Sequence, residues 1–186
     1  MLIAELFLQK TQAKQVEPVY RRFLKEFPVI EVLARAPLRK IRRSVWSLGL
    51  VGRARNLKEM ARIAVSRFGG KLPAAEGGLM ELKGVGRYAA NAVLCFALGQ
   101  RRAVVDANVV RMLGRYFGIR SEKNRPHTDD RLWEIAQVLI PKKGAREYNW
   151  AVFDFAALVC TARKPECPEC VLRRWCRWPE KTEGGS

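Results

Sequence analysis

The segment Leu82-Lys83-Gly84-Val85-Gly86-Arg87-Tyr88 lies between two stretches of helical pattern and decides the fold. Gly84 and Gly86 allow backbone angles that a side chain disfavours, and they let backbone N–H groups approach an anion closely. We expect Val85 to pack into the core and a helix to begin at about Arg87, with its positive end facing the same anion. The segment therefore predicts a hairpin between two helices in which residues 84–87 bind a phosphate.

The sequence on both sides of this hairpin predicts further helices. Apolar residues recur three and four positions apart, and no pair of strands is indicated. Asp106 follows two apolar residues and is expected to cap the helix after it. We therefore expect an all-α fold. The predicted helices cover residues 2–13, 16–26, 29–35, 37–46, 54–67, 79–82, 87–98, 107–117, 129–140 and 146–159.

Four of the five cysteines form the pattern C-x6-C-x2-C-x5-C, at Cys160, Cys167, Cys170 and Cys176. Structural zinc sites usually pair two C-x2-C knuckles, whereas one short knuckle with two longer arms fits a [4Fe–4S] cluster. The pattern favours the cluster, and a zinc site or two disulfides are the alternatives. The fifth cysteine, Cys95, lies in an apolar helix and is expected to be a buried core thiol.

The net charge indicates a polyanionic partner. The 186 residues include 35 basic and 18 acidic side chains, which gives +17, and the basic residues are spread along the chain. Arg163 and Lys164, between the first two cysteines of the pattern, are expected to contact phosphates. No stretch of about 18 apolar residues predicts a membrane span, and the N-terminus does not resemble a secretory signal. A reduced cytoplasmic compartment is therefore expected.

The hairpin at 82–88, the sequence Val105-Asp106-Ala107-Asn108 and the four cysteines together resemble the helix-hairpin-helix DNA glycosylases of the endonuclease III and MutY superfamily. The resemblance implies a helical barrel domain over residues 12–116. It also implies a smaller cluster domain, formed by 1–11 and 117–186, that holds a [4Fe–4S] cluster. The active-site cleft would lie between the two domains. Such enzymes flip a base out of double-stranded DNA and cleave its N-glycosidic bond.

The same resemblance assigns three catalytic residues. Asp106 matches the aspartate that stabilises the positive sugar and assists the nucleophile, although it could be only a helix cap. Tyr88 stands where bifunctional members carry a lysine that forms a Schiff base, so little or no β-lyase activity is expected. Glu5 matches a glutamate of the base pocket that protonates or orients the base, or positions water. A core aromatic and a solvated acid are the alternatives for Tyr88 and Glu5.

The substrate is expected to be thymine or uracil opposite guanine. By the same resemblance, Asn108 matches a polar residue beside the aspartate and Gln9 matches a wedge residue, so Gln9, Asn108 and Leu50 are expected in the base pocket or DNA wedge. The sequences around Asp106 resemble the thymine-DNA mismatch branch. Residues 9–12 and 53–57 instead resemble MutY, which removes adenine opposite 8-oxoguanine, but Leu50 and Val51 stand where MutY has tyrosines. A non-catalytic iron–sulfur DNA-binding module is the alternative from another class. We expect a monomer acting on the nucleoid.

Overall fold

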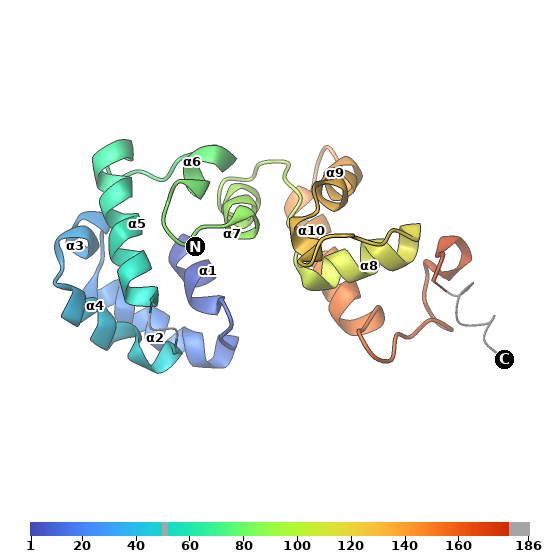
Figure 1. Cartoon of the computed structure of the whole chain (residues 1–186), viewed down its shortest axis with the longest axis horizontal. Coiled ribbons are helices and arrows are strands. Elements are labelled where there is room, and N and C mark those ends of the chain that lie inside the picture. Colours follow the sequence, from blue (N-terminus) through green and yellow to red (C-terminus); the bar gives the residue numbers. More distant parts are fainter. Residues whose placement is uncertain (50–51, 179–186) are drawn as a thin grey trace. The chain divides into compact units, whose positions relative to one another are not determined.

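The computed structural model describes residues 1–49 and 52–178, and all regular structure in these ranges is helical (Figure 1). The predicted all-α fold is therefore confirmed. The chain forms two compact units, Met1–Leu98 and Gly99–Ser186. The domain boundaries implied by the family resemblance, 12–116 against 1–11 with 117–186, stay a prediction.

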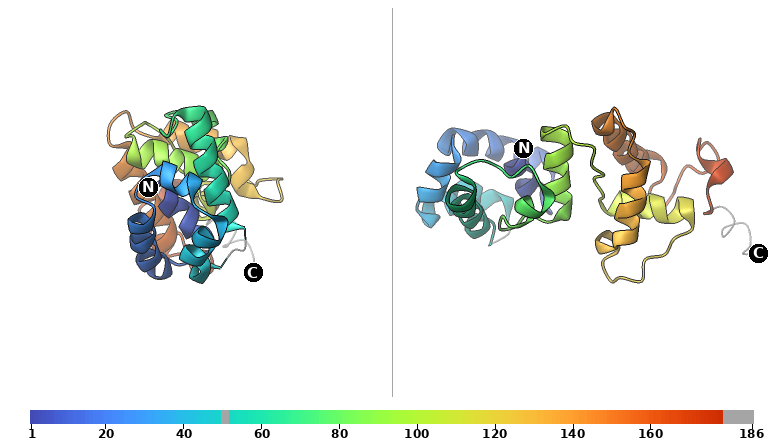
Figure 2. Two further views of the ribbon diagram at one scale, coloured as in Figure 1. Left: turned by 90° about the vertical axis from the view of Figure 1, so that its left-hand side faces the viewer. Right: turned by 90° about the horizontal axis from the view of Figure 1, so that it is seen from above.

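The first unit is built from short helices that pack on one another (Figure 2). The long helix α5 packs against α3 and α4, and α1 packs against α2 and α7. The helices are α1 (Leu2–Leu8), α2 (Ala13–Glu26), α3 (Ile30–Arg35), α4 (Leu38–Val45), the 3-10 turn η1 (Trp46–Leu48), α5 (Arg53–Phe68), α6 (Glu76–Met80), α7 (Arg87–Ala92) and the π-helical turn η2 (Val93–Ala97).

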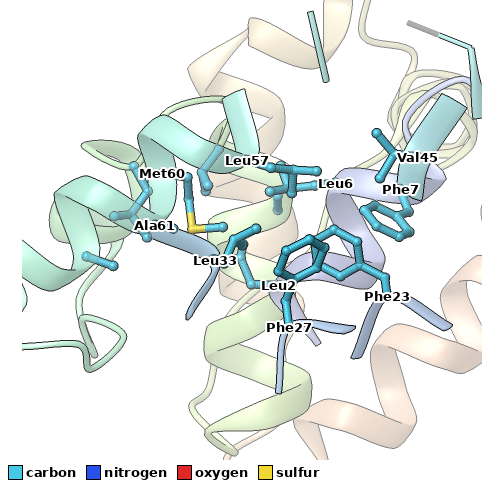
Figure 3. Packing of buried hydrophobic residues seen from close by; sticks show 14 of the residues in the cluster. Leu2, Leu6, Phe7, Phe23, Phe27, Leu33, Val45, Leu57, Met60 and Ala61 are labelled. Atoms are coloured by element: carbon cyan, nitrogen blue, oxygen red, sulfur yellow. The ribbon is translucent and has the colours of Figure 1, made fainter. Parts of the chain in front are cut away.

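The core of this unit is a continuous apolar cluster (Figure 3). Phe7 of α1 meets Phe23 of α2 edge to face, with ring centroids 5.1 Å apart. Leu57 and Met60 of α5 are fully buried in the same cluster. Burying each such side chain contributes about 1.5–3 kcal/mol. Val85 joins the cluster as predicted, so the hairpin is anchored to the core by its central residue.

The single helix predicted over residues 2–13 is wrong. Helix α1 ends at Leu8, a turn follows, and α2 begins at Ala13. Lys10, in the turn, has a left-handed backbone with φ of 56°. Hydrogen bonds from Arg53, far along the chain, hold this turn, and tertiary contacts of this kind override local helix propensity.

The second unit contains α8 (Ala107–Phe117), η3 (Pro126–Thr128), α9 (Asp130–Leu139), α10 (Ala145–Asp154), the π-helical turn η4 (Phe155–Val159) and η5 (Arg173–Trp175). Helix α8 is central, because it contacts α9, α10 and η4. Asp106 caps it as predicted: a side-chain oxygen accepts from the backbone N–H of Val109 at 2.8 Å.

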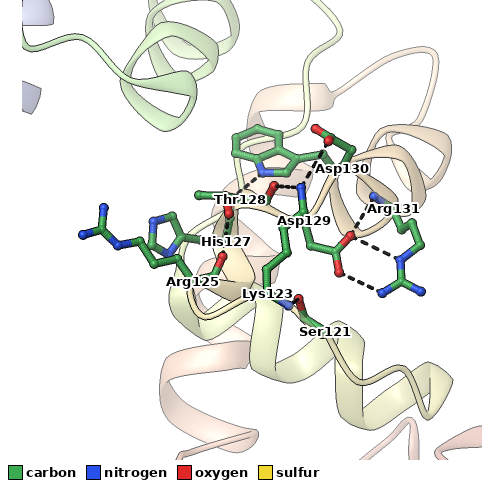
Figure 4. Close-up of polar contacts among 9 residues, drawn as sticks. Ser121, Lys123, Arg125, His127, Thr128, Asp129, Asp130 and Arg131 are labelled. Carbon is green, nitrogen blue, oxygen red and sulfur yellow. Dashed lines mark hydrogen bonds and ion pairs between the residues drawn. The ribbon is translucent and has the colours of Figure 1, made fainter.

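Asp129 caps the next helix, α9, and pairs with Arg131 (Figure 4). Its carboxylate accepts from the Arg131 backbone N–H at 3.2 Å and lies 3.0 Å from the guanidinium Nη2. Hydrogen bonds from Arg131 and Ser121 lower the pKa of Asp129 to about 2. The charged carboxylate is thus part of the folded structure of this unit.

Within the described part of the chain, no helix combines the length and the apolar character that crossing a membrane requires.

Candidate active site and metal centre

The hairpin has the backbone that the sequence predicts. Gly84 has φ of 86°, and a Cβ there would lie 3.4 Å from Asn56 atoms. Gly86 has an extended backbone, with nothing within 4 Å of an added Cβ, and it precedes α7 directly. The positive end of α7 therefore points at the hairpin. The Arg87 side chain forms an ion pair with Glu76, at 3.2 Å, so it is engaged within the protein.

Three further predicted site residues belong to the same unit. The Gln9 side chain donates from Nε2 to the carbonyl of Gly84 at 3.1 Å, which joins the predicted wedge to the predicted phosphate hairpin. Tyr88 is half-buried and packs against the apolar cluster. Glu5 is half-buried in α1, where burial raises the pKa of its carboxyl group and the N-terminal amine partly opposes the shift. Leu50 lies outside the described residues.

The second unit holds the predicted catalytic carboxylate in a chain of hydrogen bonds. Asp106 is half-buried, and its second oxygen accepts from Asn108 Nδ2 at 3.0 Å. Asn108 Oδ1 accepts from Arg111 Nη1 at 2.8 Å. Arg111 also donates to the carbonyls of Ala156, at 2.6 Å, and Cys160, at 3.0 Å. This series of hydrogen bonds therefore links the Asp106 carboxylate to Cys160, the first residue of the cysteine pattern.

Arg111 and Arg115 are polar anchors that the sequence analysis did not single out. Arg115 donates to the carbonyls of Thr161 and Ala162, at 2.6 and 2.9 Å, and it stacks on the Trp178 ring. Both arginines lie on α8, five and nine positions after Asp106. That proximity along one helix is the only signal in the sequence, and it does not reveal which carbonyls they bind.

The four cysteines of the pattern line one cavity with apolar side chains, among them Met112, Phe155 and Trp178. All five cysteines lie among the described residues, and no disulfide joins any of them. Burial raises the pKa of the Cys176 thiol, and the three other cysteines of the pattern raise it further. Among the described residues, no three His, Cys, Asp or Glu side chains converge on a single ion. Four cysteine side chains that line one cavity are a donor set able to hold a [4Fe–4S] cluster.

Arg163 and Lys164 are exposed in the arm between Cys160 and Cys167. The arm begins at carbonyls held by Arg111 and Arg115, and Thr161 Oγ1 donates to the carbonyl of Lys164 within it. Cys95 is buried in the first unit, as predicted. Glu5, Gln9 and Tyr88 belong to residues 1–98, and Asp106 and Asn108 to residues 99–186. Their meeting in one cleft stays a prediction.

Comparison with known proteins shows the class to which this fold and site belong. Residues 3–137 match the family model of the HhH-GPD superfamily base excision DNA repair proteins, and the chain belongs to this superfamily. Residues 160–176 match the iron–sulfur binding domain of endonuclease III. The chain is therefore a DNA glycosylase with a [4Fe–4S] cluster, and its partner is DNA.

Individual relatives cover nearly the whole chain. It is 37% identical to a thymine/uracil-DNA glycosylase of Methanothermobacter thermautotrophicus, over 97% of this chain and 82% of the relative. It is 43% identical to a thymine/uracil-DNA glycosylase of Pyrobaculum aerophilum, over 92% and 76%. A solved structure of a thermostable thymine-DNA glycosylase superposes with a TM-score of 0.88 at 37% identity, over 97% of this chain and 83% of that one.

Proposed function

We propose that this glycosylase removes thymine or uracil mispaired with guanine from double-stranded DNA. The observation that carries the proposal is the fixed carboxylate of Asp106, oriented by Val109 and Asn108 in the second unit. Relatives named for thymine and uracil support the choice of base. A human relative named adenine DNA glycosylase is 34% identical, but this chain spans only 33% of that protein.

Asp106 acts on the sugar of the flipped nucleotide. As the bond to the base breaks, positive charge develops on the sugar ring, and a carboxylate that is already oriented stabilises this charge without reorganising. Each Asp106 oxygen has more than one acceptor site, so the bonds to Val109 and Asn108 leave capacity for water. Water attacks the anomeric carbon, its proton is taken up by the carboxylate, and the base leaves with the bonding electron pair.

Glu5 supplies a proton to the departing base. Its raised pKa keeps more of the carboxyl group protonated than in an exposed glutamate, which suits a proton donor. Tyr88 has no amine with which to form an imine on the sugar. The product is therefore an abasic site in an intact strand.

The DNA backbone is held at two places. Residues 84–87 and the positive end of α7 bind one phosphate, and Arg163 and Lys164 bind another. Cys160, Cys167, Cys170 and Cys176 are the cluster ligands. Held by these cysteines, the cluster would keep the cysteine loop in place, and with it the arm that carries Arg163 and Lys164. Arg111 donates to the carbonyl of Cys160 in this loop and to Asn108, which in turn donates to Asp106. The loop therefore helps to orient the Asp106 carboxylate.

The test is an assay of duplexes that each contain one T:G, U:G, A:8-oxoguanine or A:G pair, with and without alkali. We expect T:G and U:G duplexes to give strand breaks only after alkali. Breaks from the two adenine duplexes alone would assign the chain to adenine removal instead. The protein is expected to act as a monomer in the cytoplasm, on the nucleoid, and sedimentation with and without DNA tests the monomer.

A further inference from the structure

The guanidinium of Arg53 is buried without a carboxylate partner. Arg53 is the first residue of α5 and only 4% exposed. Among the described residues no acidic side chain forms an ion pair with it, and its Nε has no hydrogen-bond partner. Burial lowers the pKa of Arg53. A cation at the start of a helix also opposes the helix dipole. This placement does not serve the stability of α5, so it needs another reason.

The remaining nitrogens of Arg53 join two segments that are distant in sequence. Nη1 donates to the carbonyl of Leu48, at the end of η1, at 2.9 Å. Nη2 donates to the carbonyl of Gln9 at 2.8 Å and to Thr11 Oγ1 at 3.1 Å. Thr11 Oγ1 in turn donates to the Leu48 carbonyl at 3.2 Å. One planar guanidinium thus fixes the Gln9–Thr11 turn against η1, which a point-like ammonium could not do.

The turn that Arg53 holds is strained. Lys10, at its centre, is the one non-glycine residue with positive φ in the described part of the chain, and lysine disfavours this conformation. The Arg53 bonds to Gln9 and Thr11 lie on either side of Lys10 in the sequence. The Gln9 side chain, on the same turn, bonds to Gly84 of the hairpin. Strained backbone held by its surroundings is typical of functional sites.

We propose that Arg53 is a positioning residue for base extrusion. It holds the Gln9–Thr11 turn in its left-handed conformation, so that the wedge Gln9 stays in register with the phosphate hairpin and with η1. The inference rests on the proposed function, because it takes Gln9 as the wedge. Arg53 itself touches neither the base nor the sugar.

The first test replaces Arg53 and measures base removal under single-turnover conditions. With saturating T:G duplex, and at a temperature where each variant is folded by circular dichroism, we expect Arg53→Met to slow base removal roughly 10–100-fold, the cost of small misplacements. Arg53→Lys should fall between Arg53→Met and the unaltered protein. Duplex affinity should change less than about 3-fold, because the hairpin and the cysteine arm keep their phosphate contacts.

A rescue experiment separates turn geometry from general stability. Glycine adopts the left-handed conformation without strain, so Lys10→Gly in the Arg53→Met background should restore part of the rate. Lys10→Gln removes the same charge but keeps the strain, and it should restore none. Equal effects of the two Lys10 changes would contradict the proposal, as would an Arg53→Met variant that loses stability but keeps the full single-turnover rate.

The Arg53 clamp is the set of hydrogen bonds by which Arg53 holds the Gln9–Thr11 turn against η1. Hydrogen exchange tests this clamp without an activity assay. Arg53→Met should speed amide exchange in residues 9–12 and 46–49 and leave the α5 core protected. Unchanged exchange in residues 9–12 and 46–49 would contradict the inference. If the unaltered protein removes no base from any duplex, the proposed function fails while the exchange result still decides whether the clamp exists. If Arg53→Met does not fold, Thr11→Val removes the bonds that the Thr11 hydroxyl forms with Arg53 and Leu48 and keeps the Arg53 bonds to the carbonyls of Gln9 and Leu48. A smaller change in exchange in the same direction is then expected, and no change would count against the clamp.

Discussion

At the scale of single residues, Asp106 caps α8, and its proposed catalytic role can be tested separately from the cap. Asparagine caps helices about as well as aspartate, but it carries no charge. We therefore expect Asp106→Asn to retain the thermal stability of the folded protein and to slow base removal about 10²–10³-fold, the range measured for the loss of one electrostatic stabiliser. Thermal melting and single-turnover kinetics check the two parts. A variant with full activity would reduce Asp106 to a cap.

Glu5 predicts a pH dependence. Burial raises its pKa, so the protonated form persists above the usual value of about 4.3. If this form delivers the proton to the base, the rate is highest below the raised pKa and falls as pH rises through it. Glu5→Gln should lower the rate and remove that descending limb from the pH–rate profile. A limb that survives in Glu5→Gln would belong to another group.

Gly84 and Gly86 form a matched pair within the hairpin. Gly84→Ala places a side chain in a left-handed conformation and against Asn56, so we expect it to lose about 1–2 kcal/mol of stability and also DNA affinity. Gly86→Ala meets no protein atom and has an extended backbone, so it should keep stability and lose only affinity. Melting and duplex titration check both. Intact affinity in Gly86→Ala would mean that the phosphate does not approach there.

At the scale of elements, the cap of α9 predicts how the second unit responds to acid. Asp129 has a pKa of about 2 in the folded protein, below the value of about 3.9 for an unfolded aspartate. A lowered pKa means that its stabilisation is present above about pH 4 and is lost as pH falls towards 2. Asp129→Asn should therefore weaken the unit at neutral pH and flatten this part of the acid profile. Acid titration of α-helical circular dichroism measures both. An unchanged profile would show that Asp129 and Arg131 do not stabilise the fold.

Elements were predictable wherever one local rule applied. The cap at Asp106, the start of α7 at Arg87 and the burial of Val85 follow from local patterns, and the structure confirms them. The turn after α1 was missed because Arg53, more than forty residues away, decides it. The roles of Arg111 and Arg115 were missed because their partners are also distant in the sequence. These partners are backbone carbonyls at and after Cys160, and since every residue has a backbone carbonyl, the sequence does not indicate which ones are bound.

At the scale of the whole molecule, the four cysteines of the pattern and the proposed catalytic carboxylate of Asp106 belong to one unit, and helix α8 connects them. Asp106 caps α8, while Arg111 and Arg115 on α8 hold the start of the cysteine loop. If Arg163 and Lys164 bind phosphates and Asp106 is catalytic, as we propose, a cluster held by these cysteines would support both by ordering this loop. Its contribution is the placement of side chains, and no step of the proposed reaction passes through it.

The central claim is hydrolysis of a mispaired pyrimidine without strand cleavage, and mass spectrometry of the reacted strand tests it most directly. A T:G duplex is incubated with excess protein, and the intact masses of both strands are recorded without heat or alkali. We predict that the thymine strand loses thymine and gains a hydroxyl group at that position, with its full length preserved. Shorter fragments with an unsaturated sugar end, or a strand of unchanged mass, would contradict the account.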